Sequence, residues 1–313
     1  MPKPALLQIG KVLPSMEGRL EAGFEVVEFS DLASLSDPAA IVAVATMKGI
    51  SDEVMEALPN LKIIASFGVG YDSIKADLAA AKGILVTHTP DVLNDEVADT
   101  AIMLWLAVSK ELIPAEAWAR SGEWEAKGAY PLTRSVRGQK VGILGLGRIG
   151  QTIAGMCQMF GAEVVYHTRG VKDVPYRHYA DLVGMARDVD VIFVITPGGP
   201  ATEKLVNAEV LAALGPEGIL INVARGSVVD EAALVEALQT GKLGAAGLDV
   251  FEAEPKIPEA LKGLKNVVLV PHIGSATVET RAAMGDLVCN NLDQWLEDGR
   301  AVTPVPECKH LND

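Results

Sequence analysis

The sequence predicts an α/β protein built from two doubly wound domains, each with a parallel sheet. Short runs rich in Val and Ile recur along the chain, and amphipathic stretches of helical length separate them. Such strand–helix alternation is typical of parallel sheets covered by helices on both faces. The 313 residues also exceed what one hydrophobic core usually serves, and a long apolar segment divides the runs into two series.

Each predicted strand is an apolar run. The first series is Ala5–Ile9, Glu25–Val27, Ile41–Ala45, Lys62–Ser66 and Ile84–Thr87. The second series is Lys140–Leu144, Glu163–His167, Val191–Ile195, Ile219–Asn222, Ala245–Val250 and Val267–Val270. Helical periodicity predicts helices over Ser51–Leu58, Ile74–Lys82, Ile149–Phe160, Glu231–Gln239 and Val278–Leu296. Asp230 is the expected N-cap of the helix that begins at Glu231, and Gly241 follows its end.

The segment between the two series is apolar and periodic over Asn94–Arg120, with no glycine. We predict one continuous helix there, opening the second domain. Ser121–Arg137 follows it and contains Gly, Trp and Pro, which is typical of an irregular arm. Trp105, Trp118 and Trp124 lie in this region and suit either an interface core or ordinary packing.

Composition excludes several classes of function. The formal net charge is −14, and an acidic surface disfavours nucleic acid and anionic membranes as partners. Cys157, Cys289 and Cys308 are too few and too scattered for a disulfide framework or a metal site. The N-terminal residues lack the apolar core of a signal peptide, so we expect a cytoplasmic protein.

A glycine-rich loop predicts a dinucleotide site. Gly145, Gly147 and Gly150 form a GxGxxG pattern, GLGRIG, between a predicted strand and a predicted helix. The first glycine permits a tight turn, the second lets a pyrophosphate approach, and the third permits close packing of helix and strand. The helix N-terminus attracts the phosphate charge, and Arg148 and Ile149 lie there among the expected cofactor contacts, Arg148 either as a phosphate ligand or as an exposed side chain.

The next strand favours NADPH over NADH. An NAD site would normally place Asp or Glu where Thr168 stands, to bind the ribose 2′-hydroxyl. Arg169 follows, and a guanidinium in place of a carboxylate suits a 2′-phosphate. We therefore expect NADPH, with NADH weaker; the alternative is that Arg169 is a solvated surface residue. Glu163, at the start of this strand, is badly placed for the ribose.

Residues that follow strands of the second series complete the predicted site, because ligands of open α/β sheets bind at that edge. Arg225 follows one strand, and a guanidinium there would hold a 2-keto acid by its carboxylate and polarise its carbonyl. Asp249 lies at the end of another strand. Its carboxylate would either accept a hydrogen bond from the nicotinamide amide or be buried and paired with backbone N–H groups. The same edge contributes four further predicted cofactor contacts: Thr196, Val223, Ala224 and Gly274.

His272 is the predicted general acid. It follows the last strand, and an imidazolium there would protonate the alkoxide that forms when hydride attacks the keto carbon. A neighbouring carboxylate would fix its tautomer, and either Glu252 or Glu254 suits that role. His88 also follows a strand and is the main rival, but His272 shares a domain with Arg225 and the glycine loop.

Four segments, GLGRIG, INVARGSVVDEAAL, GLDVFEAEP and PHIGSAT, resemble the D-isomer-specific 2-hydroxyacid dehydrogenase family in order and spacing. The resemblance covers essentially the whole chain. It places the family's catalytic residues on Arg225, Glu254 and His272, and its nicotinamide-contacting Asp on Asp249. It also implies two domains with a cleft between them, a discontinuous substrate domain of residues 1–98 plus 286–313, and a dinucleotide domain of residues 99–285.

Within the family, the chain looks closest to NADPH-dependent glyoxylate/hydroxypyruvate reductases, including hydroxyphenylpyruvate-reductase-like members. His167-Thr168-Arg169 and the loop SFGVGYD carry this likeness, and the resemblance implies that the N–H groups of Val69 and Gly70 bind the substrate carboxylate. It also implies a homodimer whose 122–137 arm crosses to the partner, with Tyr130–Arg134 near the partner's pocket. Lys48, in another loop of the first domain, is a further candidate to face the cleft.

Two alternatives keep the fold and change the function. A dinucleotide-sensing module without catalysis is disfavoured because Arg225, Glu254 and His272 are all present. A phosphoglycerate-type NAD dehydrogenase would need an acid near Thr168 and usually a longer chain. A phosphonate or formate dehydrogenase stays open in principle.

Overall fold

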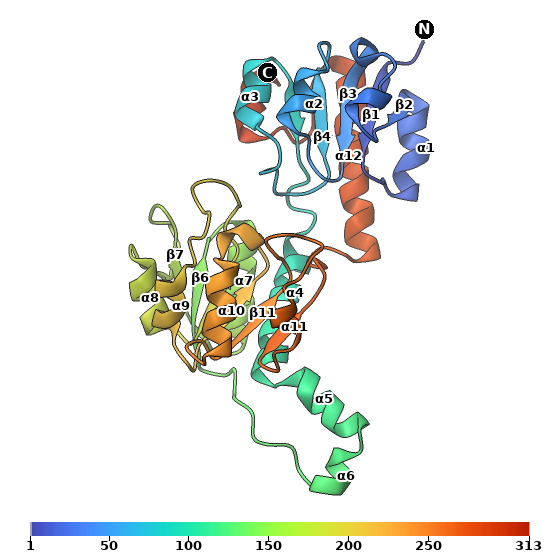
Figure 1. Cartoon of the computed structure of the whole chain (residues 1–313). Coiled ribbons are helices and arrows are strands. Elements are labelled where there is room, and N and C mark those ends of the chain that lie inside the picture. The colour runs from blue at the N-terminus through green and yellow to red at the C-terminus, as the bar shows by residue number, and fades with distance from the viewer. Residues whose placement is uncertain (1, 313) are drawn as a thin grey trace. The chain divides into compact units, whose positions relative to one another are not determined.

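The computed structural model describes residues 2–312, which divide into two compact units (Figure 1). Unit 1 comprises the chain up to Leu93 together with the chain from Thr277 onward, and unit 2 comprises Asn94–Ala276. Each unit has its own parallel sheet with helices around it, which confirms the predicted fold class.

Unit 1 is built on a sheet of five parallel strands in the order β2-β1-β3-β4-β5. This is the strand order of flavodoxin-like domains. The strands are β1 (Ala5–Ile9), β2 (Glu25–Glu28), β3 (Ile41–Thr46), β4 (Ile63–Ser66) and β5 (Leu85–Thr87). The helices are α1 (Pro14–Gly23), α2 (Asp52–Glu56), α3 (Ala76–Ala81) and α12 (Val278–Asp298), with 3-10 turns η1 (Leu32–Ser34), η2 (Pro38–Ala40) and η4 (Pro306–Leu311).

Unit 2 is built on a sheet of seven parallel strands in the order β12-β11-β10-β9-β6-β7-β8. The strands are β6 (Lys140–Leu144), β7 (Glu163–His167), β8 (Arg177–His178), β9 (Val191–Val194), β10 (Ile219–Asn222), β11 (Ala245–Leu248) and β12 (Val267–Leu269). The helices are α4 (Asn94–Ser109), α5 (Leu112–Arg120), α6 (Glu123–Lys127), α7 (Arg148–Met159), α8 (Leu182–Asp188), α9 (Ala208–Leu214), α10 (Glu231–Gln239) and α11 (Glu259–Lys262), with the 3-10 turn η3 (Gly226–Val228).

The order in which successive strands are added to this sheet switches at β6. Strands β7 and β8 extend the sheet on one side of β6, and β9 lies on its other side, parallel to it. Dinucleotides bind at such a switch point, outside the carboxyl ends of the strands. The loop after β6 is the glycine-rich loop, and Thr196 follows β9. The topology therefore brings these two predicted cofactor segments together.

Every strand predicted from the sequence is present, and most of them are buried parallel strands that read as continuous apolar runs. β8 was missed, since it is only two polar residues long. The predicted cap of α10 is confirmed, because the Asp230 carboxylate accepts a hydrogen bond from the Ala233 N–H at 3.1 Å. Gly241 takes a φ of 70° just beyond α10, a conformation that favours glycine.

The prediction of one helix over Asn94–Arg120 is wrong. Helix α4 ends at Ser109, and α5 begins at Leu112 after Glu111, whose φ is 50°. Pro114 explains the break, because a proline in a helix interior has no N–H and clashes with the carbonyl four residues earlier. The residue therefore sits in the first turn of a new helix. The irregular arm that follows also contains the short helix α6.

Trp105 is a core residue and not a surface anchor. It is fully buried, its indole N–H donates to the Gln139 side chain at 2.9 Å, and its ring meets Phe160 and Phe193 edge-on. Gly247 of β11 lies against α4, where an added Cβ would stand 2.9 Å from Leu104. Helix α4 therefore packs tightly on the sheet of unit 2.

The unit boundaries lie at helix ends. The expected divisions at 98/99 and 285/286 fall inside α4 and α12, and the observed units keep each helix whole. Helix α4 packs on α7 and on β10 and β11, while α12 packs on α1 and β4. Within residues 2–312, no helix is both long and apolar enough to cross a membrane, and no cluster of three metal-ligating side chains occurs.

Candidate active site

The glycine-rich loop of unit 2 is shaped by close backbone contacts. A Cβ on Gly145 would lie 2.7 Å from the Thr196 backbone nitrogen, and one on Gly150 would lie 2.2 Å from the Gly145 carbonyl oxygen. Both distances are shorter than any real side chain accepts, so these two positions require glycine. Gly145 also has a φ of 101° and donates its N–H to the His167 carbonyl at 3.0 Å.

Gly147 differs from the other two glycines. A Cβ on it would meet nothing within 4 Å, so the space in front of the loop is open there. Gly147 is the N-cap of α7 and provides no side-chain cap, so the first-turn N–H groups of Arg148 and Ile149 face that space at the positive end of the helix. This arrangement fits the pyrophosphate of a dinucleotide.

The end of β7 presents the predicted ribose contacts. Thr168 donates its hydroxyl to the Gly170 carbonyl at 2.6 Å, which closes a tight turn around Arg169. Arg169 is exposed and forms no ion pair within residues 2–312. Glu163 pairs instead with Lys140 at 3.3 Å, at the opposite end of the strand. The turn therefore offers a guanidinium and no carboxylate.

His178 is a contributor to this turn that the sequence did not reveal. Its Nε2 donates to the Thr168 carbonyl at 3.0 Å, and its ring stacks at 9° to that of His167. His167 in turn is fixed by a 2.8 Å hydrogen bond between Nδ1 and the Tyr179 carbonyl. Because β8 escaped prediction, no signal placed His178 beside β7.

Arg225 leaves β10 on a turn held by Asn222. The buried Asn222 amide donates to the Arg225 carbonyl at 3.0 Å and accepts from the Ala224 N–H at 3.1 Å. The Arg225 guanidinium donates to the Ala224 carbonyl at 2.8 Å. Val223 and Ala224, which precede Arg225 on this turn, are buried. Asn222 is a second positioning residue that the sequence analysis missed.

The turn that carries Arg225 packs directly against the backbone of the loop after β11. A Cβ on Gly226 would lie 1.9 Å from the Phe251 carbonyl carbon. Only glycine permits this approach of two backbones. It joins the segment that holds Arg225 to the segment that holds Glu254.

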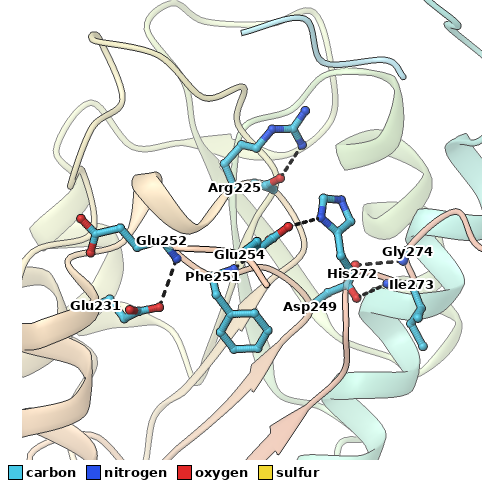
Figure 2. A network of polar contacts seen from close by, with 10 residues as sticks. Arg225, Glu231, Asp249, Phe251, Glu252, Glu254, His272, Ile273 and Gly274 are labelled. Atoms are coloured by element: carbon cyan, nitrogen blue, oxygen red, sulfur yellow. Dashed lines mark hydrogen bonds and ion pairs between the residues drawn. The ribbon is translucent and has the colours of Figure 1, made fainter. Parts of the chain in front are cut away.

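Glu254 and His272 form a hydrogen-bonded pair (Figure 2). The His272 Nδ1 lies 2.7 Å from the Glu254 Oε2, and Glu254 Oε1 accepts from the Phe251 N–H at 3.0 Å. The carboxylate is thus fixed by its own loop and fixes the imidazole in turn. With Nδ1 engaged by Glu254, Nε2 has no hydrogen-bond partner within residues 2–312. The side chains are 47% and 35% exposed, so the pair is accessible to a ligand.

The choice between Glu252 and Glu254 is resolved by this geometry. The Glu252 side chain points away from His272 in Figure 2, and its N–H donates to the Glu231 carboxylate at 3.1 Å. Glu252 is exposed and contacts the start of α10 through its backbone. Glu254 is the residue that meets the histidine.

Asp249 supports the turn on which His272 sits. It is 1% exposed, and its two carboxylate oxygens accept from the N–H groups of Ile273 at 2.6 Å and Gly274 at 2.9 Å. Burial raises the pKa of this carboxyl, while the two backbone hydrogen bonds oppose the rise. A Cβ on Gly274 would stand 2.8 Å from the carboxylate, so a larger residue there would displace the Asp249 side chain. His272 itself has a φ of 53°, a strained conformation for a non-glycine residue.

The remaining predicted residues lie on other segments of the chain. Val69, Gly70, Lys48 and His88 belong to unit 1, and the first two form the loop after β4. Within unit 2, Arg134 pairs with Glu217 at 2.9 Å and the Tyr130 hydroxyl donates to Glu111 at 2.7 Å. Both arm residues therefore have partners in their own chain.

Known proteins match the chain along most of its length. A family model described as D-isomer specific 2-hydroxyacid dehydrogenase, NAD binding domain, matches residues 102–274. The chain is 46% identical over 258 residues to hydroxyphenylpyruvate reductase of Plectranthus scutellarioides, covering 82% of each chain. It is 41% identical over 307 residues to 2-ketogluconate reductase of Gluconobacter oxydans, covering 97% of this chain and 99% of that one. A crystal structure of NADPH-dependent glyoxylate/hydroxypyruvate reductase from Sinorhizobium meliloti, in complex with NADP and malonate, matches with a TM-score of 0.94 at 50% identity and covers 98% of both chains.

Proposed function

The chain belongs to the D-isomer-specific 2-hydroxyacid dehydrogenase family, and we propose that it reduces small 2-keto acids, glyoxylate and hydroxypyruvate first among them, with NADPH as the hydride donor. The observation that carries this proposal is the 2.7 Å contact between His272 and Glu254, on the loops that follow β12 and β11. A carboxylate–imidazole pair at the ligand-binding edge of a dinucleotide fold is a proton donor beside a hydride site.

We assign the chemical steps to three side chains. Arg225 binds the substrate carboxylate and polarises the keto oxygen, which draws electron density away from the carbonyl carbon. NADPH, when bound, supplies the hydride that this carbon accepts. His272, as an imidazolium, donates the proton on Nε2 to the alkoxide oxygen, so the C=O bond becomes an alcohol. Glu254 holds Nδ1 and stabilises the imidazolium before the transfer.

The cofactor preference rests on the turn after β7. Arg169 would pair with the 2′-phosphate of NADPH, and Thr168 replaces the carboxylate that an NAD site would use. The glycine-rich loop and the first turn of α7 would hold the pyrophosphate. Thr196, Val223, Ala224, Asp249 and Gly274 complete the proposed set of cofactor contacts, and Val69 with Gly70 are proposed for the substrate carboxylate.

A second substrate class has a specific observation in its favour. The 46% identity to a hydroxyphenylpyruvate reductase makes an aromatic 2-keto acid the main alternative. A sensing role without catalysis is disfavoured, because the histidine, its carboxylate and the arginine are all present and the first two are in contact. The aromatic acid belongs in any test of substrate range.

We further propose a cytoplasmic homodimer. Leu112 and Ile113 of α5 are more than half exposed, as are Trp124 and Leu132 of the arm, and an apolar surface of this kind suits a protein interface. The three cysteines are free thiols, which suits a reducing compartment. Sedimentation of the full chain tests the assembly, and a monomer at micromolar concentration would contradict it.

The function is tested by following nicotinamide absorbance with NADPH and then NADH, against glyoxylate, hydroxypyruvate, pyruvate and hydroxyphenylpyruvate. We expect NADPH to be oxidised fastest with the two small polar acids. Faster turnover of hydroxyphenylpyruvate would replace the substrate assignment and keep the enzyme class. No oxidation with any of the four acids would contradict the proposal.

A further inference from the structure

The loop after β4 in unit 1 offers two backbone donors. Gly68, Val69 and Gly70 lie there, all partly exposed, and the N–H groups of Val69 and Gly70 donate to no group within residues 2–312. Gly68 has a φ of 154°, which leaves the regular strand conformation. A pair of adjacent N–H groups without partners is a site for an anion.

The carbonyl ends of the same two peptides are both occupied. The Gly68 carbonyl accepts from the Thr89 N–H at 2.8 Å, and the Val69 carbonyl accepts from the His88 Nδ1 at 3.0 Å. A carbonyl oxygen only accepts, so Nδ1 carries the proton in this contact. In a planar trans peptide the C=O and N–H bonds point in opposite directions. Fixing both carbonyls toward His88 and Thr89 therefore turns both N–H groups to the other side.

His88 is itself held firmly. Its carbonyl accepts from the Thr303 hydroxyl at 2.6 Å, and its N–H donates to the Thr303 carbonyl at 3.3 Å. Thr303 donates its N–H to the buried Asn291 side chain at 2.8 Å. The His88 ring also meets Tyr71 edge-on at 5.4 Å, and the Tyr71 hydroxyl donates to Glu307 at 3.1 Å. Contacts within the chain therefore orient the imidazole, which in turn holds the Val69 carbonyl.

We propose that His88 is a positioning residue, which orients the Val69–Gly70 peptide so that the Gly70 N–H binds the substrate carboxylate. The inference rests on the proposed function, since it assumes a carboxylate substrate at this loop. It gives the rival histidine of the sequence analysis a role other than proton transfer. Without the imidazole, the Val69 carbonyl loses its partner and the peptide is free to rotate.

Two substitutions separate this role from mere packing. His88→Leu keeps a comparable volume and removes the donor, whereas His88→Asn keeps an amide N–H near the position of Nδ1. We expect His88→Leu to raise KM for glyoxylate about 10- to 100-fold, the range for losing one hydrogen bond to a charged group. KM for NADPH should stay within about twofold, and kcat should change far less than KM. His88→Asn should restore most of the substrate affinity.

An uncharged substrate separates the two roles, because a purely structural defect would lower kcat/KM for charged and uncharged substrates alike. Ethyl glyoxylate has the same reactive aldehyde carbon and no carboxylate, so His88→Leu should reduce kcat/KM for glyoxylate much more than for the ester. Equal losses for acid and ester, or no rescue by His88→Asn, would overturn the inference while the wild-type activity stands. A wild-type protein inactive on every 2-keto acid would instead remove the proposed function and this inference with it. A urea unfolding curve for each variant identifies any loss that is due to misfolding.

Discussion

Three glycines, one at the N-cap of α7 and two within the helix, should respond to alanine in three different ways. Gly150→Ala adds a Cβ that would lie 2.2 Å from the Gly145 carbonyl oxygen. Gly147→Ala and Gly155→Ala each add a Cβ with nothing within 4 Å. The same added methyl group is therefore crowded at Gly150 and meets open space at Gly147 and Gly155. Of the two open positions, only Gly147 faces the proposed pyrophosphate.

The magnitudes follow from these distances. Carbon–oxygen contacts settle at roughly 3.3–3.6 Å, so Gly150→Ala forces the loop to yield by about 1 Å. Overpacking of this kind costs about 1–3 kcal/mol of stability, and it displaces the loop that would bind the cofactor. Gly155 is an exposed residue inside the helix, so alanine there should stabilise the protein by about 0.5–1 kcal/mol. Gly147→Ala should leave stability near the wild-type value while its methyl group blocks the approach of the pyrophosphate.

The assays are urea unfolding for stability and the KM for NADPH for cofactor binding. We expect Gly150→Ala to lose both, Gly147→Ala to raise KM at least tenfold with stability intact, and Gly155→Ala to match the wild-type KM. An unchanged KM in Gly147→Ala would refute the assignment of this loop to the pyrophosphate. Equal stability of Gly150→Ala and Gly155→Ala would refute the packing argument itself.

Three further results are expected. Arg169→Ala should raise KM for NADPH at least tenfold and leave KM for NADH nearly unchanged, because only NADPH carries the 2′-phosphate; equal changes would remove the assignment. Asp249→Asn places an NH2 group against one of two backbone donors and should lower the free energy of unfolding by about 1–3 kcal/mol, measured in urea. Burial raises the pKa of the Cys157 thiol to about 12, so at pH 8 it is protonated and should resist alkylation until the protein is denatured; rapid modification of the native protein would contradict its burial.

Local sequence signals predicted the sheets and the glycine loop well. Buried strands such as Val191–Val194 are continuous apolar runs, and the loop glycines sit between a strand and a helix that were both recognisable. The break before α5 had a local signal too, Pro114, and the prediction of one helix gave it too little weight. Helix periodicity continued on both sides and obscured the break.

Contacts distant in sequence were harder to predict. His272 and Glu254 are eighteen residues apart and on different loops, so residue types alone left Glu252 equally eligible. Asn222, His178 and His88 act through backbone carbonyls, which have no sequence signature. Their roles depend on where turns place a peptide, and only the three-dimensional structure shows this.

The most direct test of the account is the turnover of His272→Gln with NADPH and hydroxypyruvate beside that of the wild-type protein. The wild type should oxidise NADPH, and the variant should lose about two to four orders of magnitude in kcat, the usual contribution of a general acid. The KM for NADPH should stay close to the wild-type value. Retained turnover in the variant, or none in the wild type, would contradict the assignment of His272 as the proton donor of a 2-keto acid reductase.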